Sequence, residues 1–250
     1  MISILTYNIH GLPWSVDNTL PIARWSGVCG AELLCFQEVF TEYRQNTLKR
    51  ILEEHDYTVY FPNDAIGSVV PSGLCIALQN SSLWKKVSIR FTPFFNYSYW
   101  DTFANKGFFS IYLQHKDGLQ IRILNTHMHS DLELPYYSGT YYTNQLRRKQ
   151  LEEMVNEYGN SRTLTLIIGD LNQEGMIHSR VKNICCKEGD AITTFPSTGH
   201  NVDHVALLTG TGTKPILRSI KIGNHILWSD HSPVAFAIAI ASSRTQSRIV

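Results

Sequence analysis

Short apolar and β-branched runs alternate with polar segments along the whole chain, a pattern that predicts many strands and few helices. No low-complexity run, internal repeat or Pro/Ser/Gly-rich linker divides the sequence. We therefore expect one domain over residues 1–241, followed by a polar, basic tail over residues 242–250. The predicted strands are residues 2–7, 32–37, 57–61, 74–79, 107–114, 119–126, 164–169, 205–208, 216–222 and 233–241.

Three stretches show helical spacing instead. In the clearest of them, Thr143 is the expected N-cap and Gly159 the expected C-cap. The other two predicted helices are residues 21–31 and 41–54. Many strands with a few helices between them predict an α+β sandwich, in which two sheets pack face to face with helices outside.

The composition indicates a folded protein whose net charge produces no strong overall electrostatic field. Hydrophobic residues make up 43% of the 250 positions, which is enough for a sizeable core and excludes disorder for most of the chain. The 22 Lys and Arg residues nearly balance the 21 Asp and Glu residues, so any grip on nucleic acid would have to be local. The five cysteines are irregularly spaced and include no CxxC pair, which argues against a disulfide framework and a structural zinc site.

The N-terminal sequence and the hydropathy predict a soluble, intracellular protein. Residues 1–8, Met-Ile-Ser-Ile-Leu-Thr-Tyr-Asn, have neither the basic start nor the small-residue cleavage site of a signal peptide. The longest strongly apolar stretch, residues 234–241, is far shorter than the ~20 residues of a membrane span. Peripheral association with a membrane stays compatible with both observations.

Polar residues of catalytic type stand where the predicted strands end or begin. In an antiparallel sheet, the end of one strand and the start of its neighbour lie on the same edge, so these side chains can converge on one rim. They are Asn8, Glu38, His127, Asp170, Asn172, Asp203, Asp230 and His231.

Convergence would bring together Glu38, Asp170, Asp203 and Asp230, whose mutual repulsion is tolerable only beside a cation. Carboxylates and amide oxygens are hard donors that favour Mg²⁺ or Mn²⁺ over softer ions. Such an ion beside histidines and asparagines suits phosphoryl chemistry: it polarises a phosphate oxygen while a base deprotonates the attacking water.

Each of these positions also has an ordinary structural interpretation. Asn and Asp at strand ends are commonly turn formers, Glu38 could cap the following helix, and His127 or His231 could be hydrogen-bonded rim histidines. We assign no catalytic role to the remaining histidines considered, which are His10, His129, His200 and His204.

The order of these motifs resembles the endonuclease/exonuclease/phosphatase superfamily, which includes deoxyribonuclease I, abasic-site endonucleases, inositol polyphosphate 5-phosphatases and neutral sphingomyelinases. The similarity spans residues 6 to 231. It implies a deoxyribonuclease I-like fold, a four-layered α/β sandwich of two mostly antiparallel sheets with helices outside. The matching motifs are Thr-Tyr-Asn8, Cys-Phe-Gln37-Glu38, Asn-Thr-His127, Gly-Asp170-Leu-Asn172, Val-Asp203-His and Ser-Asp230-His231.

The resemblance also implies a metal site and an enzyme. Glu38 would be the principal Mg²⁺ ligand, with Asn8 and Asp230 contributing directly or through water. Mn²⁺ would be an acceptable substitute for Mg²⁺. The implied activity is the hydrolysis of a phosphodiester by metal-assisted attack of water.

The implied catalytic residues surround that metal. His231 would act as the general base, oriented by Asp203, and His127 would donate to the phosphate. Asp170 and Asn172 would orient the water and stabilise the transition state. The sequence leaves open how water activation divides between Asp170 and His231.

Within the superfamily, the motifs are most similar to those of neutral sphingomyelinases. Asn8 is followed by Ile-His-Gly-Leu-Pro, similar to Asn-x-x-Gly-Leu-Pro, and Asn105-Lys106-Gly107 opens a predicted strand. A helix with Arg147-x-x-Gln150-Leu follows the His127 segment. This likeness implies that sphingomyelin is split into ceramide and phosphocholine, with Lys106 neutralising a phosphate oxygen; the alternative for Lys106 is a solvated strand start.

A nuclease of the same fold, acting on DNA or RNA, is the main alternative. It would need a basic groove, and basic residues cluster only at Lys85-Lys86 and Arg147-Arg148-Lys149. An inositol polyphosphate phosphatase and a non-catalytic binding module are less favoured, and a binding module would normally have lost a site residue.

Residues 91–103 hold seven aromatic residues just ahead of Lys106. Aromatic rings with polar atoms between them suit a membrane interface, which would bring a sphingolipid headgroup to the site. The equally favoured alternative is that they pack beneath the loop as a small satellite core.

Overall fold

The computed structural model describes residues 1–63, 70–96, 104–131, 140–175, 178–184, 193–208, 215–223 and 228–240. These residues build two six-stranded sheets. The predicted tail over residues 242–250, like its boundary at residue 241, lies outside this part of the chain.

The two sheets repeat one arrangement of strand directions. The first sheet has the order β11 (Pro215–Ile222), β12 (Val234–Ile240), β1 (Ile2–Asn8), β2 (Leu33–Gln37), β4 (Cys75–Gln79) and β3 (Tyr57–Tyr60). The second has the order β5 (Trp84–Pro93), β6 (Gly107–His115), β7 (Gln120–His127), β8 (Leu164–Asp170), β10 (Asp203–Leu208) and β9 (Val181–Asn183). In each sheet the two central strands are parallel, β1 with β2 and β7 with β8, and every other described neighbour pair is antiparallel.

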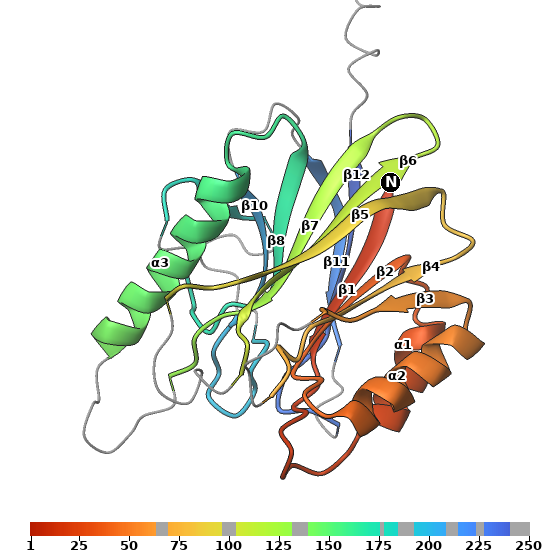
Figure 1. Cartoon of the computed structure of the whole chain (residues 1–250), viewed down its shortest axis with the longest axis horizontal. Coiled ribbons are helices and arrows are strands. Elements are labelled where there is room, and N and C mark those ends of the chain that lie inside the picture. Colours follow the sequence, from red (N-terminus) through yellow and green to blue (C-terminus); the bar gives the residue numbers. More distant parts are fainter. Residues whose placement is uncertain are drawn as a thin grey trace, which may run out of the picture.

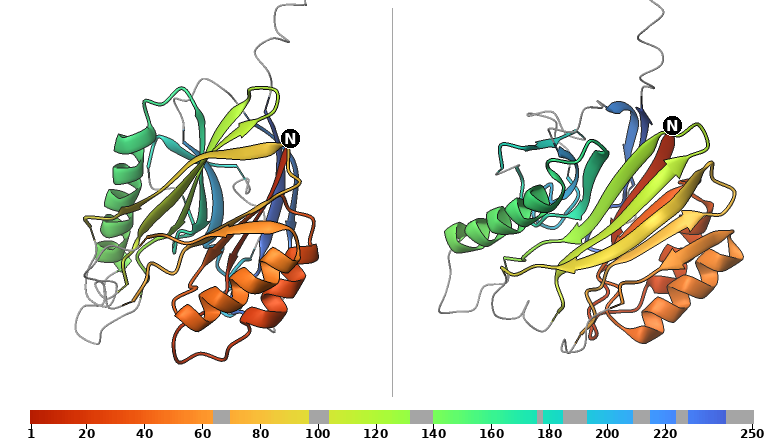
Figure 2. Two further views of the ribbon diagram at one scale, coloured as in Figure 1. Left: turned by 45° about the vertical axis from the view of Figure 1, so that its right-hand side comes forward. Right: turned by 45° about the horizontal axis from the view of Figure 1, so that its top comes forward.

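Helices cover the outer faces of both sheets. The helices α1 (Thr19–Val28) and α2 (Glu42–Glu54) lie on the first sheet, and α3 (Thr140–Tyr158) lies on the second, as Figures 1 and 2 show. Each parallel pair requires a crossover connection, which α1 supplies between β1 and β2 and α3 supplies between β7 and β8. The predicted four-layered α/β sandwich of mostly antiparallel sheets is confirmed. No helix in the described ranges is both long enough and apolar enough to span a membrane.

Alternating side chains on the central strands form the core between the sheets and then become polar toward one end. The residues facing the other sheet on β1 are Ile2, Ile4, Thr6 and Asn8. On β8 they are Leu164, Leu166, Ile168 and Asp170. Because alternate residues of a strand face the same way, Asn8 and Asp170 point into the space between the sheets, as the apolar residues before them do. They lie at one edge of that space.

Several element boundaries differ from the predicted ones. The sequence did not predict β5, because this edge strand is largely exposed and charged and lacks a long apolar run. It also missed β9, which is only 3 residues long. Thr143 is not the N-cap of α3, since the helix begins at Thr140 and the Thr143 hydroxyl donates to Asp131 Oδ1 instead. The helix does end beside Gly159, whose amide donates to Val155 O at 2.7 Å.

Candidate active site

The predicted site residues meet at one edge of the sandwich. This is the lower edge in Figure 1, away from the labelled N-terminus. The parallel registers pair Asn8 with Gln37 and His127 with Asp170, so each sheet brings two strand ends to this edge. Asp203 opens the antiparallel strand β10 directly opposite Asp170. Convergence thus depends on a parallel pair at the centre of each sheet as well as on the antiparallel neighbours assumed from the sequence.

Asn8 joins the two sheets at the middle of the site. Its Nδ2 group lies 3.0 Å from Glu38 Oε1, 3.0 Å from Asp170 Oδ2 and 3.4 Å from His231 Nε2. Its Oδ1 atom accepts the backbone N–H of His10 at 3.0 Å. The amide nitrogen, rather than the oxygen expected of a metal ligand, therefore faces the two carboxylates and screens their repulsion.

Glu38 is held in an uncommon backbone conformation, with φ of 62°. Two glycines allow the chain to approach it closely: a Cβ on Gly11 would lie 1.8 Å from Glu38 O, and one on Gly73 would lie 3.2 Å from Glu38 Cα. Burial raises the pKa of the Glu38 carboxyl, although the hydrogen bond from Asn8 opposes this. Its Oε2 atom is buried and has no hydrogen-bond partner among the described residues. A buried carboxylate oxygen left in this way fits a cation ligand.

His231 and Asp203 form a buried pair beside Asp170. The ring Nδ1 lies 2.8 Å from Asp203 Oδ2, which leaves Nε2 directed toward Asp170 Oδ2 at 3.6 Å. Burial opposes a charged ring, but Asp203 and then Asp170 outweigh it and raise the pKa of His231 to about 10. The Phe195 ring packs against the imidazole with a centroid separation of 4.8 Å.

The second sheet supplies His127, Asp170 and Asn172. The His127 Nε2 atom lies 3.5 Å from Asp170 Oδ2 and 3.9 Å from Glu38 Oε1. Asp170 Oδ1 accepts the Asn172 backbone N–H at 2.8 Å, and Asn172 Nδ2 donates to Met128 O at 3.1 Å. Lys106 is also buried, and its Nζ donates to the same Met128 carbonyl at 2.7 Å. The solvated alternative for Lys106 is therefore excluded.

Asp230 lies at the outer side of this group. Its Oδ2 atom pairs with His10 Nδ1 at 2.9 Å, and its Oδ1 atom lies 4.0 Å from His231 Nε2. The described residues with the mutual spacing of metal ligands form two groups, which are Glu38, His127 and Asp170, and Asp170, Asp203 and His231. Asp170 is common to both groups, whereas Asp230, predicted as a ligand, belongs to neither. The contact with His10 had no sequence indication apart from the nearness of His10 to Asn8.

Helix α3 holds the segment that follows His127. The Arg147 guanidinium donates to His129 O at 3.1 Å and to Asp131 Oδ1 at 2.8 Å. The Gln150 side chain accepts the His129 N–H at 3.0 Å and donates to Asn96 O at 2.8 Å. The predicted Arg-x-x-Gln pattern thus places both side chains on one helical face, where they position the backbone beside the site.

A buried amide pair joins the sheets directly behind the site and was not predicted from the sequence. Gln37 Nε2 donates to Asn125 Oδ1 at 2.7 Å and to Thr6 Oγ1 at 3.1 Å. Asn125 Nδ2 donates in turn to Phe36 O and Cys75 O, each at 3.0 Å. All of these bonds except the one to Thr6 cross between the two sheets, and they involve the residue just before Glu38 and the residue two before His127.

Replacing Gln37 by leucine is expected to destabilise the protein by about 1–3 kcal/mol, because the buried Asn125 oxygen would lose its donor. Urea unfolding of the metal-free protein measures this effect. Gln114→Leu on β6 is the matched control, since the Gln114 side chain is exposed. Equal stabilities of the two variants would contradict the bridging role.

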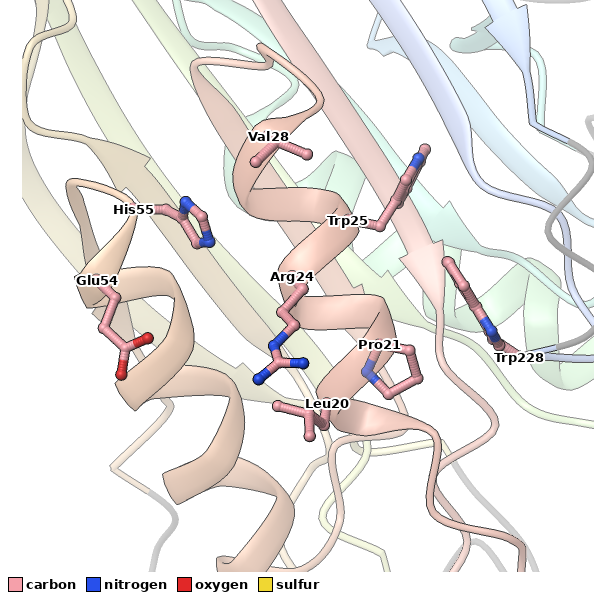
Figure 3. A pocket seen from close by; sticks show the side chains of 8 residues that line it. All are labelled: Leu20, Pro21, Arg24, Trp25, Val28, Glu54, His55 and Trp228. Atoms are coloured by element: carbon pink, nitrogen blue, oxygen red, sulfur yellow. The ribbon is translucent and has the colours of Figure 1, made fainter.

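A groove of about 570 Å³ lies apart from these residues, on the outer side of α1 (Figure 3). Its lining comes from α1, from the end of α2 and from Trp228, and includes none of the predicted site residues. The lining residues are Leu20, Pro21, Arg24, Trp25, Val28, Glu54, His55 and Trp228.

No protein-family model and no curated protein matches the sequence. Among solved structures, a Staphylococcus aureus beta toxin with bound magnesium ions matches with a TM-score of 0.69 at 14% identity, over 94% of this chain and 98% of the toxin chain. Sphingomyelinase C from Streptomyces griseocarneus matches with a TM-score of 0.65 at 15% identity, over 96% and 99% of the two chains. D. rerio TDP2 complexed with a single-strand DNA product matches with a TM-score of 0.70 at 14% identity, over 95% and 98%. The chain therefore shares the fold of these proteins, a deoxyribonuclease I-like sandwich.

Proposed function

We propose that this protein is a divalent-metal-dependent phosphodiesterase and that its preferred substrate is sphingomyelin. The observation that carries the proposal is the meeting of two features at Asp170. One is Glu38, whose buried Oε2 has no partner among the described residues, and the other is His231, oriented by Asp203 with Nε2 toward Asp170. Metal-assisted hydrolysis of a phosphodiester needs a hard cation that polarises the phosphate and an oriented base that deprotonates the attacking water.

Glu38 and Asp170 are the carboxylates best placed to hold the cation. Their oxygen donors favour Mg²⁺ or Mn²⁺, and the S. aureus beta toxin of the same fold carries magnesium ions. Asn8 would join them through its amide oxygen after a rotation of the side chain, and Asp230 would contribute from the outer side. When bound, the cation would neutralise these carboxylates and polarise a phosphate oxygen.

His231 is proposed as the base that takes a proton from the attacking water. The bond between Nδ1–H and Asp203 fixes the tautomer and leaves Nε2 to accept the proton. In the absence of a cation, the surrounding carboxylates hold a proton on the ring. Neutralising Asp170 and Asp230 would lower the pKa of His231 toward the range in which an imidazole acts as a base.

The second sheet would bind the phosphate. His127, Asn172 and Lys106 all contribute donor groups beside Asp170 or the Met128 carbonyl. As the water oxygen bonds to phosphorus, the bond from phosphorus to the lipid alcohol oxygen breaks. The products would be ceramide and phosphocholine.

Two observations favour a lipid over a nucleic acid. Neither basic cluster found in the sequence lies on the strand ends that form the site. Lys85 and Lys86 begin β5 at the opposite edge. In the second cluster, Arg147 is buried in an ion pair with Asp131, and the exposed Arg148 and Lys149 lie on the outer helix α3. Two residues of the motifs similar to those of sphingomyelinases lie at the site: Gly11 packs against the Glu38 backbone, and Lys106 donates to the Met128 carbonyl that also accepts from Asn172. The neighbour TDP2, complexed with a DNA product, keeps nucleic acid as the second candidate.

A side-by-side hydrolysis assay tests this proposal. The substrates are sphingomyelin, phosphatidylcholine, an abasic duplex, plasmid DNA and an inositol polyphosphate, each with Mg²⁺, with Mn²⁺ and with EDTA. We expect the fastest turnover on sphingomyelin, support by both metals, and loss of activity in EDTA. Faster cleavage of either DNA substrate would contradict the lipid assignment, and activity on none of the five would contradict the enzyme assignment.

A further inference from the structure

The exposed aromatic side chains in the described ranges all lie in segments that follow a strand ending at the edge of the sandwich where the candidate site lies. Trp14 lies between β1 and α1, Phe95 follows β5, and Tyr43 and Tyr142 occupy the first turns of α2 and α3. At the opposite edge, the exposed apolar side chains of the described residues are aliphatic, as at Leu83. Scattered exposed apolar residues are ordinary, but aromatic residues gathered at one edge indicate a contact surface there.

Three side chains on this edge are more exposed than any other large apolar side chain in the described part. They are Phe95 at 86%, Trp14 at 82% and Val16 at 78%. Two separate segments carry them, residues 11–16 on the first sheet and residues 93–96 on the second.

The segment with Trp14 is anchored beneath its exposed side chains. The buried Arg44 donates from its guanidinium to Leu12 O at 2.7 Å and to Ser15 O at 2.9 Å. Gly11 packs directly on the backbone of Glu38. The backbone on either side of Trp14 is therefore anchored while its side chain is exposed to solvent, and the same segment contacts Glu38, the proposed metal ligand.

The segment with Phe95 also lies beside the site and is anchored through its backbone. The register of β5 with β6 and of β6 with β7 brings Pro93 level with the end of β7, where His127 lies. Glu153 accepts the backbone N–H groups of Phe95 at 3.0 Å and Asn96 at 3.1 Å, and Lys106 O accepts the N–H of Phe94 at 2.9 Å.

The aromatic stretch predicted as a membrane contact is divided by the structure. Phe94 is buried against Phe108, with ring centroids 5.8 Å apart, so the core interpretation holds for it. Phe95 points into solvent, and Phe91 is partly buried against the core between the sheets. The remaining aromatics of the stretch, Tyr97, Tyr99, Trp100 and Phe103, lie outside the described residues.

The charge of the two segments distinguishes between possible partners. Residues 11–16 are Gly-Leu-Pro-Trp-Ser-Val and residues 93–96 are Pro-Phe-Phe-Asn, so neither segment has a charged side chain. A surface for a nucleic-acid backbone needs Lys and Arg for phosphate contacts. Uncharged aromatic and aliphatic side chains instead suit the interfacial zone of a bilayer with zwitterionic headgroups.

We propose that residues 11–16 and 93–96 form a membrane-docking rim, in which Trp14, Val16 and Phe95 enter the interface of a bilayer rich in phosphocholine headgroups. Docking on both sides of the site edge would present a headgroup to Glu38 and Lys106 without extracting the lipid. This inference rests on the proposed function and adds to it the surface by which the protein reaches its substrate.

Vesicle binding and hydrolysis, measured separately, test the rim. Binding to vesicles of phosphatidylcholine and sphingomyelin is measured by sedimentation in EDTA, and turnover is measured with Mg²⁺ on the same vesicles and on a small soluble phosphodiester. The double variant Trp14→Ser with Phe95→Ser should lose about tenfold or more in vesicle binding and vesicle hydrolysis, with turnover of the soluble substrate unchanged. Trp14→Phe alone should retain vesicle binding.

The matched control is Leu83→Ser with Val87→Ser, which removes two exposed apolar side chains at the opposite edge and should behave as the wild type. Unchanged vesicle binding by the rim variant would overturn the proposal, as would an equal loss on the soluble substrate. A loss confined to the binding of a single-stranded oligonucleotide would overturn it in favour of a nucleic-acid surface. A wild type that binds vesicles through these residues yet hydrolyses no phosphodiester would support the rim and contradict only the proposed function.

Discussion

Glu38→Gln is expected to lower phosphodiester turnover by several orders of magnitude while leaving the fold intact. The substitution keeps the volume and the acceptor for Asn8 but removes the negative charge that the proposed cation site needs. Because burial disfavours the charged form of Glu38 in the metal-free protein, the variant should be at least as stable as the wild type without metal. Turnover, Mn²⁺ binding by calorimetry and thermal unfolding with and without Mg²⁺ measure the three effects.

Glu42→Gln serves as the control, since Glu42 is an exposed acid on the following helix and its loss should change neither binding nor turnover. Full activity of the wild type in EDTA, or an unimpaired Glu38→Gln enzyme, would remove the basis for a metal-dependent mechanism.

His231→Ala is expected to reduce kcat by about 10²–10⁴-fold with little change in KM, because general-base catalysis acts in the transition state rather than in substrate binding. Asp203→Asn should reproduce part of this loss. It should also lower the pKa of His231 in the metal-free protein, because Asp203 is the largest of the influences that raise it. NMR titration of the imidazole and steady-state kinetics provide the two readouts.

His55→Ala, at the end of α2 away from the site edge, is the control and should retain wild-type kinetics. A His231→Ala enzyme with raised KM and undiminished kcat would exclude His231 as the base. Asp170, whose Oδ2 lies 3.6 Å from His231 Nε2, would then be the first candidate.

The polar residues of the site could be found in the sequence because each one ends or opens a strand pattern. Asp170 closes an apolar run whose alternate members face the other sheet, and the two-residue period carries its side chain into the same interior. The apolar runs likewise predicted ten of the strands. They also predicted the sandwich, because sheets that must each bury an apolar face can pack in only a few architectures.

The elements that the sequence did not predict correctly lie in segments whose burial is not periodic or whose hydrogen-bond partner is distant in the sequence. The exposed strand β5 has no apolar pattern to reveal it, and its pairing with β6 supplies what its own sequence does not. The start of α3 lies before Thr143, because that hydroxyl bonds to Asp131 across a turn instead of capping the helix.

By itself, the sequence determined which side chains are available at the strand ends, and these predicted the class of fold and the type of chemistry that we propose. Only the tertiary structure decided further contacts among them, which are those of Asn8 with Glu38 and Asp170 and of Asp230 with His10. It also decided that Gln37 and Asn125 join the sheets behind the site. The physical reason is that periodicity reports the face on which a side chain lies, which is a local property. These contacts instead join residues as far apart as His10 and Asp230, 220 positions from each other, and depend on strand order and register.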